Sequence, residues 1–279
     1  MISRKIEQEL ERFSKSNRNY ALLIDGARQV GKTFIIESFG QSHYESFIKI
    51  DFIRTPDAHK IFNNVENEAD VLTRLSALTD KPLIKGHTLI FFDEIQKCPE
   101  VVTYVKYLVQ EGSYRYILSG SLLGVELKGI RSVPVGFMDE VKMFPLDLEE
   151  FICSLGDYSS LLVEVRKAWE LKKPLAQVLH DKMMRLFRLY LVVGGMPEAV
   201  QTYIDTNDIR QVVSVQMKIL KDYRRDISQY DEKNALRIRE VFDRLAPELN
   251  EKNKRFHADS VADAGRFDRL EDEFVWLKA

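Results

Sequence analysis

The sequence predicts an α/β fold in which a parallel β-sheet lies between two layers of helices. Two observations carry this prediction. Short apolar runs alternate with stretches of helical periodicity through the first half of the chain, and a glycine-rich loop joins the first apolar run to the helical stretch after it. Strands that alternate with helices of this length are joined by right-handed crossovers, which place the strands parallel to one another.

The elements follow one another in a regular order. An amphipathic helix opens the chain, because apolar residues recur at helical spacing from Ile2 to Phe13. From Asp147 onward the sequence becomes helical throughout, with a Gly-Gly-Met-Pro interruption at 194–197 and a charged final segment at 207–279. Strands are predicted at 21–24, 46–52, 88–92, 114–119 and 141–144, and further helices at 34–39, 66–78, 100–110 and 164–191.

Composition excludes several classes of protein. The chain has 279 residues, of which 45% are hydrophobic and 30% charged, which is ordinary for a globular protein of about two domains. A formal net charge of −2 gives no overall attraction to nucleic acid, which is therefore a possible but unsupported partner. No apolar run has the length of a membrane span and the N-terminus does not resemble a signal peptide, so we expect a cytoplasmic protein without a membrane partner.

Cysteine and histidine give no metal or redox signal in the sequence. Cys98 and Cys153 are the only cysteines, and neither belongs to a C-x-x-C pair or lies beside a histidine pattern. Two reduced structural thiols are therefore expected. The histidines have no metal-ligand spacing and are expected to be structural or exposed; they are His43, His59, His87, His180 and His257.

The loop after the first predicted strand carries a phosphate-binding pattern. Gly26 and Gly31 permit backbone conformations in which successive N–H groups turn toward a phosphate. Lys32 is expected to reach the β- and γ-phosphates of ATP, and Thr33 to give a hydroxyl to Mg²⁺. A glycine turn with a chance lysine is the alternative, but the strand before the loop and the helix after it favour a P-loop. The complete pattern is Gly26-Ala27-Arg28-Gln29-Val30-Gly31-Lys32-Thr33.

Two acids follow the third predicted strand. A buried strand carries Asp93 and Glu94 to the carboxyl edge of the sheet, where folds of this kind bind ligands. Asp93 is expected to hold Mg²⁺, and Glu94 to activate the attacking water as a general base. An apolar run before two acids is a weak signal alone, and an exposed strand end explains it equally well. Following a P-loop at ordinary spacing, it indicates a Walker B strand, and the adjacent glutamate favours hydrolysis over transfer to another acceptor.

The fourth predicted strand ends in serine. We expect this strand to lie between the P-loop strand and the Walker B strand, so that a polar side chain at its end can reach the γ-phosphate or the attacking water. Ser119 is preferred to Ser121 for this role of sensor. A serine that belongs only to a glycine-containing turn remains the alternative.

Taken in order, these segments resemble the prokaryotic AAA-type ATPases whose P-loop reads G-A-R-Q-V-G-K-T and which usually carry a C-terminal domain of unknown function. The resemblance implies a P-loop NTPase core of the AAA (ASCE) type at 1–155, a helical lid at 156–206 and a winged-helix-like segment at 207–279. It also implies that Pro197 senses the nucleotide, as a similar G-x-P does in STAND-type signalling ATPases; a simple helix stop and start is the alternative. The matching segments are 26–33, 89–94 with Gln96, 118–121, 145–151, 194–200 and 276–277.

The sequence departs from this family in two places. Many relatives have a Gly-Arg pair just before the last core strand, where this chain reads Pro-Val-Gly-Phe at 134–137. Arg131 lies nearby, but a surface arginine is a simpler interpretation than an arginine finger. Family members also continue into a larger C-terminal domain, so we expect that domain to be absent here, as in a truncated member.

The function expected from these features is slow hydrolysis of ATP to ADP and phosphate, coupled to a conformational switch. ATP and Mg²⁺ are the expected cofactors, and the lid would close through the segment 195–197. The alternative is a nucleotide-binding interaction module with little or no turnover, which the missing arginine finger favours. An unknown protein partner or self-association is expected, whereas a DNA-processing motor has little support from the charge balance.

Overall fold

The fold was determined as a computed structural model that describes residues 2–121, 136–230, 235–253, 256–258, 261 and 270–278. The described residues form two compact units. The first holds residues 2–121 and 136–215, and the second holds the described residues from Gln216 onward. Arg131, Pro134 and Val135, which precede the last core strand in the sequence, lie outside the described residues.

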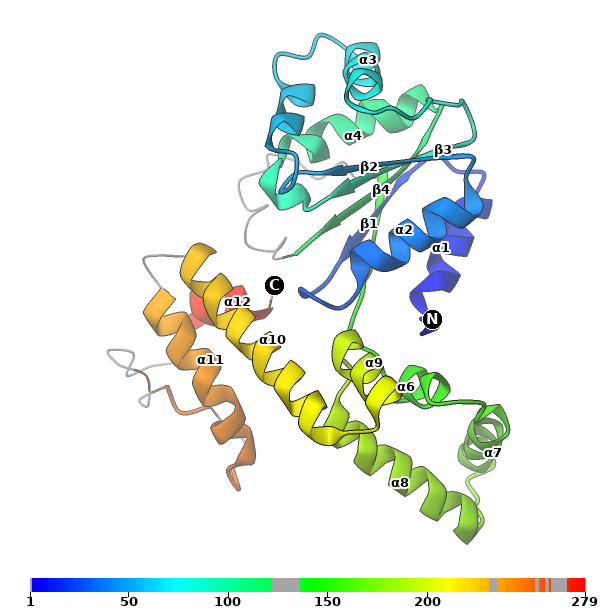
Figure 1. The fold of residues 1–279 in the computed structure, drawn as a ribbon, viewed down its shortest axis with the longest axis vertical. Helices are drawn as coiled ribbons and strands as arrows, with labels where there is room; N and C mark the ends of the chain where they lie inside the picture. The colour runs from blue at the N-terminus through cyan, green and yellow to red at the C-terminus, as the bar shows by residue number, and fades with distance from the viewer. Residues whose placement is uncertain are drawn as a thin grey trace. The chain divides into compact units, whose positions relative to one another are not determined.

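The first unit is built on one sheet of parallel strands in the order β2-β3-β4-β1-β5 (Figure 1). This sheet confirms the predicted α/β class. The first four strands along the chain fall where the apolar runs predicted them, because each run is largely buried. The strands are β1 Ala21–Asp25, β2 Ser46–Asp51, β3 Thr88–Asp93, β4 Arg115–Gly120 and β5 Met138–Lys142.

The last strand lies earlier in the chain than predicted, at Met138–Lys142 rather than 141–144. It forms one edge of the sheet, at the opposite end from β2, and pairs only with β1. Its side chains are therefore only partly covered, and Asp139, Glu140 and Lys142 can occupy it. A strand of this kind has no continuous apolar run to mark its ends.

Helices cover both faces of the sheet (Figure 1). On one face, α1 Ile6–Lys15 and α2 Lys32–His43 form a buried core with alternate residues of the strands, such as Ile24 and Phe91. On the other face lie the 3₁₀ helix η1 Pro56–Phe62, α3 Glu68–Leu78 and α4 Glu100–Glu111. There the ring of Phe62 packs on Phe92 of β3 and on Tyr104 of α4, with centroids 5.8 and 5.7 Å apart. The result is the predicted three-layer arrangement.

A helical region completes the first unit. Its elements α6 Leu148–Ser154, α7 Ser159–Glu170, α8 Gln177–Val193 and α9 Pro197–Thr206 share a second core, which includes Phe151, Leu186 and Val200. The helix expected over 164–191 is two helices, α7 and α8. The break follows from Lys172, whose φ of 52° is left-handed, and from Pro174, whose ring is incompatible with a helix interior.

The second unit is helical in its described residues. It contains most of α10 Ile209–Tyr230, together with α11 Ala235–Asn250 and α12 Glu271–Lys278. Arg224 pairs with Asp243 at 2.7 Å, and Arg237 pairs with Glu273 at 3.1 Å. No strand occurs in the described part of this unit, and the winged-helix-like interpretation stays a prediction. Among the helices of the described ranges, none has the length and apolar character that crossing a bilayer demands.

Candidate functional site

The sheet order places three loops at one edge. The fourth strand lies between the first and the third, so the carboxyl ends of β1, β3 and β4 are neighbours. In register, Asp25 at the end of β1 lies beside Gly120, and Ile24 lies beside Ser119. The glycine-rich loop, the Asp93–Glu94 pair and the serine strand end therefore meet, as the sequence predicted for a ligand site.

The loop between β1 and α2 requires glycine at two of its positions. A Cβ on Gly26 would meet the carbonyl oxygen of Met143 at 2.2 Å. Gly31 has a left-handed φ of 98° and caps the N-terminus of α2. Gln29 also has a left-handed φ, of 64°, which a non-glycine residue adopts only at some energetic cost. The loop ends at the N-terminus of α2, where the positive end of the helix dipole favours an anion.

The ammonium of Lys32 closes over this loop. Its Nζ donates to the carbonyl oxygens of Gly26 and Ala27, at 2.6 and 2.8 Å. These contacts use two of its three N–H groups. Lys32 is 7% exposed, and burial lowers its pKa, while the carboxylate of Glu94 acts in the opposite direction. The ammonium is thus a poorly solvated cation held against the backbone of the loop.

Three of the predicted site residues meet on one carboxylate. Asp93 is buried at the end of β3, and its Oδ2 accepts a hydrogen bond of 3.0 Å from the hydroxyl of Thr33. The hydroxyl of Ser119 donates to its Oδ1. Hydroxyl and carboxylate oxygens are the hard ligands that Mg²⁺ prefers, so this set fits a magnesium ion.

A lysine absent from the predicted site also reaches Asp93. Lys49 of β2 forms ion pairs with Asp93 at 3.1 Å and with Glu37 of α2 at 2.8 Å. Burial tends to lower the pKa of Lys49, but the bond to Glu37 and the charge of Asp93 raise it above its ordinary value overall. Its only signal in the sequence is that it interrupts an apolar run. Mg²⁺ at Asp93 would lie close to this second cation.

The side chain of Glu94 is held by a glutamine. Glu94 has a left-handed φ of 59° and precedes the 3₁₀ helix η2 Ile95–Lys97. The amide of Gln96 donates to the Glu94 carboxylate and, at 3.2 Å, to the hydroxyl of Ser121. Gln96 is 6% exposed, and its Oε1 accepts no hydrogen bond from the described residues. The amide nitrogen of Gln96 therefore links the candidate base to the serine at the end of the fourth strand.

The two serines of the fourth strand end contact different groups. Ser119 lies on Asp93, whereas Ser121 accepts hydrogen bonds from Gln96 and, at 3.4 Å, from Nε of Arg28 in the loop. The sequence predicted Ser119, rather than Ser121, as the sensor of the γ-phosphate. Gln96 was indicated only by the resemblance to the AAA-type ATPases. Ser119 and Ser121 are two residues apart, and alternate residues of a strand point to the same face. This spacing was the signal that both serines could belong to the site.

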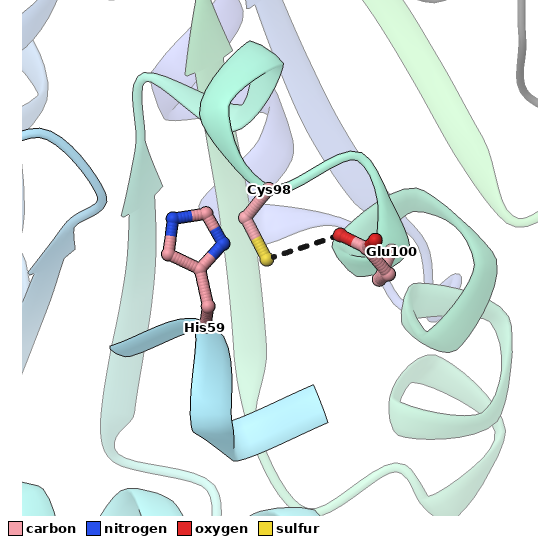
Figure 2. Close-up of side chains that lie close together, drawn as sticks. All are labelled: His59, Cys98 and Glu100. Atoms are coloured by element: carbon pink, nitrogen blue, oxygen red, sulfur yellow. Dashed lines mark hydrogen bonds between the residues drawn. The ribbon is translucent and has the colours of Figure 1, made fainter. Parts of the chain in front are cut away.

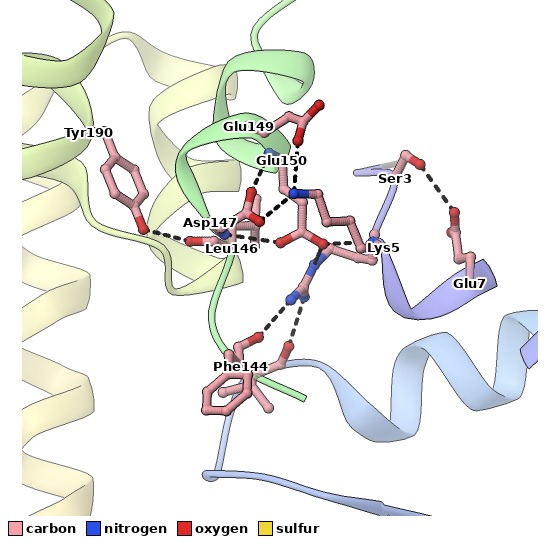
Figure 3. Close-up of polar contacts among 11 residues, drawn as sticks. Ser3, Lys5, Glu7, Phe144, Leu146, Asp147, Glu149, Glu150 and Tyr190 are labelled. Carbon is pink, nitrogen blue, oxygen red and sulfur yellow. Dashed lines mark hydrogen bonds and ion pairs between the residues drawn. The ribbon is translucent and has the colours of Figure 1, made fainter. Parts of the chain in front are cut away.

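An arginine near the N-terminus ties the loop to the helical region. Arg4 is 8% exposed. Its guanidinium donates to the carbonyl oxygen of Val30 at 3.0 Å and to that of Phe144 at 2.7 Å, and its Nε pairs with Glu150 of α6 at 3.2 Å. Glu150 also accepts from the backbone N–H of Lys5, as Figure 3 shows. Its partners lie far away in sequence, which is why no motif indicated Arg4.

A pocket of about 280 Å³ lies beside the loop. Pro197 reaches into this region, because its Cγ is 3.8 Å from the place that a Cβ on Gly31 would occupy. The same proline begins α9, whereas α8 ends at Val193, so the Gly-Gly-Met-Pro segment is also a helix stop and start. The pocket is lined by Ile2, Arg4, Gly31, Phe34, Ile35, Met143, Leu146, Pro197, Glu198 and Gln201.

Comparison with known families gives two matches along the chain. Residues 18–152 match the family model described as an AAA domain. Residues 184–279 match a domain of unknown function (DUF8612). The first match spans the whole sheet, the P-loop, the acid pair and both serines. A search of curated proteins finds no match for the chain.

Solved structures similar to the chain include an ORC1 protein, a DnaA protein and an ORC complex. The Aeropyrum pernix ORC1 protein in complex with DNA is 13% identical, with a TM-score of 0.39, over 97% of this chain and 78% of that chain. AMPPCP-bound DnaA from Aquifex aeolicus is 13% identical, with a TM-score of 0.41, over 98% and 85%. Drosophila ORC bound to DNA is 14% identical, with a TM-score of 0.41, over 98% and 79%. At TM-scores below 0.5, we draw no conclusion from these likenesses.

Proposed function

We propose that this chain, whose residues 18–152 match the family model described as an AAA domain, hydrolyses ATP to ADP and phosphate with Mg²⁺ and uses the change of nucleotide as a conformational switch. The observation that carries this proposal is the convergence on one sheet edge of the P-loop lysine, the Thr33–Asp93 pair and Glu94. Together they would supply an anion site, a set of magnesium ligands and a base.

The backbone N–H groups of the loop and the ammonium of Lys32 would bind the phosphates. The remaining N–H of its ammonium is available for a phosphate oxygen, and low exposure strengthens that electrostatic interaction. Thr33 and Asp93 would hold Mg²⁺, whose charge offsets that of the β- and γ-phosphates. Binding Mg²⁺ at Asp93 would weaken the pairing of that carboxylate with Lys49.

Hydrolysis needs a base for the attacking water. In the proposed step, water oxygen forms a bond to the γ-phosphorus, the bond from that phosphorus to the β–γ bridging oxygen breaks, and the water proton passes to the carboxylate of Glu94. Gln96 holds that carboxylate in the described structure. Release of this hydrogen bond would free Glu94 for the water, so Gln96 would be a positioning residue that controls the base.

The pocket beside Gly31 would take the nucleoside. It is lined mainly by apolar side chains, as expected of a site for a planar base, and both the AAA core and the helical region contribute to it. Pro197, at the start of α9, would contact the bound nucleotide. A change of nucleotide would then alter the position of helices α6–α9, which would act as a lid. A ligand shifts such a lid only through its different affinity for the open and closed states.

Replacing Pro197 by Ala is expected to weaken binding of ATP and ADP by roughly 4- to 15-fold, because the loss of one or two buried methylene groups costs about 0.8 kcal/mol each. Alanine at the first position of α9 should leave the helix intact. Titration with a fluorescent ATP analogue measures the change. Pro174→Ala, at an exposed proline between α7 and α8, is the matched control. Equal affinities of the Pro197 and Pro174 variants would contradict a nucleotide contact at Pro197.

Nucleotide binding itself is tested by replacing Lys32 with Ala. Loss of a charged hydrogen-bond donor to phosphate, worth about 1.5–3 kcal/mol, should weaken ATP affinity by roughly 10- to 150-fold. Isothermal titration of the purified chain with Mg²⁺-ATP gives the value directly. Lys85→Ala, at an exposed lysine of the same domain, is expected to bind normally. The proposal fails at its first step if the parent chain binds no ATP, or if both variants bind it equally well.

One observation favours a second function, a nucleotide-bound interaction module with little turnover. Glu94 is hydrogen-bonded to Gln96 rather than turned free toward the loop. In this alternative the hydrogen bond between Gln96 and Glu94 persists, and the bound nucleotide only fixes the arrangement of the helical region for a protein partner.

A second copy of the chain could also complete the site, since an arginine supplied in trans can raise phosphoryl-transfer rates on the order of 10³–10⁵. Turnover per chain that rises with protein concentration would indicate self-association of this kind.

A further inference from the structure

Three side chains with metal-binding atoms converge outside the P-loop site. His59 belongs to η1, Cys98 follows η2, and Glu100 is the first residue of α4. Their candidate ligand atoms all lie within 4.8 Å of one another, and the Cys98 sulfur is 3.5 Å from Oε2 of Glu100. Figure 2 shows the His59 ring and the Glu100 carboxylate on opposite sides of this sulfur.

The separations agree with a tetrahedral metal ion. With a zinc–sulfur distance near 2.3 Å and a zinc–oxygen distance near 2.0 Å, sulfur and oxygen ligands are about 3.5 Å apart. The Cys98–Glu100 contact already has that separation. The histidine nitrogen has to approach by about 1.5 Å at most, which rotation of a partly exposed ring on a short 3₁₀ helix allows.

The ligand atoms of His59, Cys98 and Glu100 favour Zn²⁺ over Mg²⁺. Thiolate and imidazole are borderline-soft ligands that suit Zn²⁺, whereas Mg²⁺ takes oxygen ligands almost exclusively. Cys98 is buried and Glu100 is exposed, so a fourth position on the solvent side is open to water. Burial raises the pKa of Cys98 to about 12, which makes the metal-free thiol a poor nucleophile and disfavours a redox role.

We propose that His59, Cys98 and Glu100 bind one Zn²⁺ ion, with water as the fourth ligand. The ion would join η1 to the connection between β3 and α4, the same connection that carries Glu94. Sequence spacing did not indicate the site, because His59 lies on a different loop from Cys98 and Glu100. The structure supplies the proximity that the sequence lacks.

Titration of the reduced, nucleotide-free chain with Co²⁺ tests the site, because thiolate ligation of Co²⁺ produces an intense charge-transfer absorption band. The parent chain should show this band at one equivalent and lose it when Zn²⁺ displaces Co²⁺. Cys98→Ser should remove the band, and His59→Ala should weaken Co²⁺ binding by a factor on the order of 100. Cys153→Ser, at the exposed second cysteine, and Lys32→Ala, in the P-loop, should keep it.

Thermal melting provides a second measurement that does not depend on the band. Zn²⁺ should raise the melting temperature of the parent and of Cys153→Ser, but not of Cys98→Ser. A parent chain without the band, or a Cys98→Ser chain that retains it, overturns the proposal. If Cys98→Ser does not fold, His59→Ala decides the matter, and unchanged Co²⁺ affinity in that variant overturns the proposal equally.

Discussion

The Glu94→Gln variant is expected to keep ATP bound while its single-turnover hydrolysis slows by roughly 10²–10⁴, which corresponds to about 3–5 kcal/mol of activation barrier. The amide has nearly the shape of the carboxylate but accepts no proton from water. Neither Lys32 nor Thr33 contacts Glu94 through a hydrogen bond in the structure, so the phosphate and magnesium positions should survive the change. Rapid-quench measurement of ATP cleavage, with bound nucleotide quantified in the same samples, separates chemistry from binding.

Glu68→Gln, at an exposed glutamate of α3, is the control and should cleave ATP as fast as the parent. Three other results would each change the interpretation. If Glu94→Gln is equally fast, Glu94 is not the base. If the parent and the variant both bind ATP and neither cleaves it, hydrolysis is excluded for this chain and the interaction module is favoured. Loss of binding in Glu94→Gln would instead assign Glu94 to the nucleotide site.

The inner sheet could be predicted because burial on both faces leaves continuous apolar runs. Every residue of β3 is buried, as its run of apolar residues indicated. The edge strand β5 is covered less, so solvated acids shift its apparent position. The break between α7 and α8 depends on the left-handed Lys172, which leaves no trace in hydrophobic periodicity, and on Pro174, a sequence signal that the prediction of one continuous helix did not use. Prediction therefore failed where local backbone conformation or partial exposure decides the structure.

Residues of the candidate site could be predicted where they belong to contiguous motifs. The P-loop, the acid pair and Ser119 each occupy the end of a strand, so topology alone brings them together. Lys49 and Gln96 join the site through long side chains that cross from neighbouring elements. A single lysine in a strand or a glutamine after a motif has no distinctive spacing. Their contributions depend on three-dimensional contacts that a sequence does not state.

The buried pair of Arg4 and Glu150 should have the largest effect on stability. Glu150→Ala leaves the guanidinium of Arg4 buried without its countercharge, and breaking a buried pair in this way costs about 3–5 kcal/mol. Glu150 also accepts from the backbone N–H of Lys5 and of Asp147, so two further donors lose their partner. Urea unfolding followed by circular dichroism is expected to show the loss. ATP affinity should fall as well, because Arg4 holds the Val30 carbonyl of the P-loop.

The neighbouring glutamate provides the matched control. Glu149 lies in the same first turn of α6 and pairs with Lys5 at 2.8 Å, but at the surface, where such pairs contribute about 0–1 kcal/mol. A Glu149→Ala variant as unstable as Glu150→Ala would contradict a special role for the buried pair. The double variant Arg4→Met, Glu150→Ala removes both charges and should recover part of the lost stability. Recovery should stay incomplete, because the carbonyl oxygens of Val30 and Phe144 still lack the donor that Arg4 supplied.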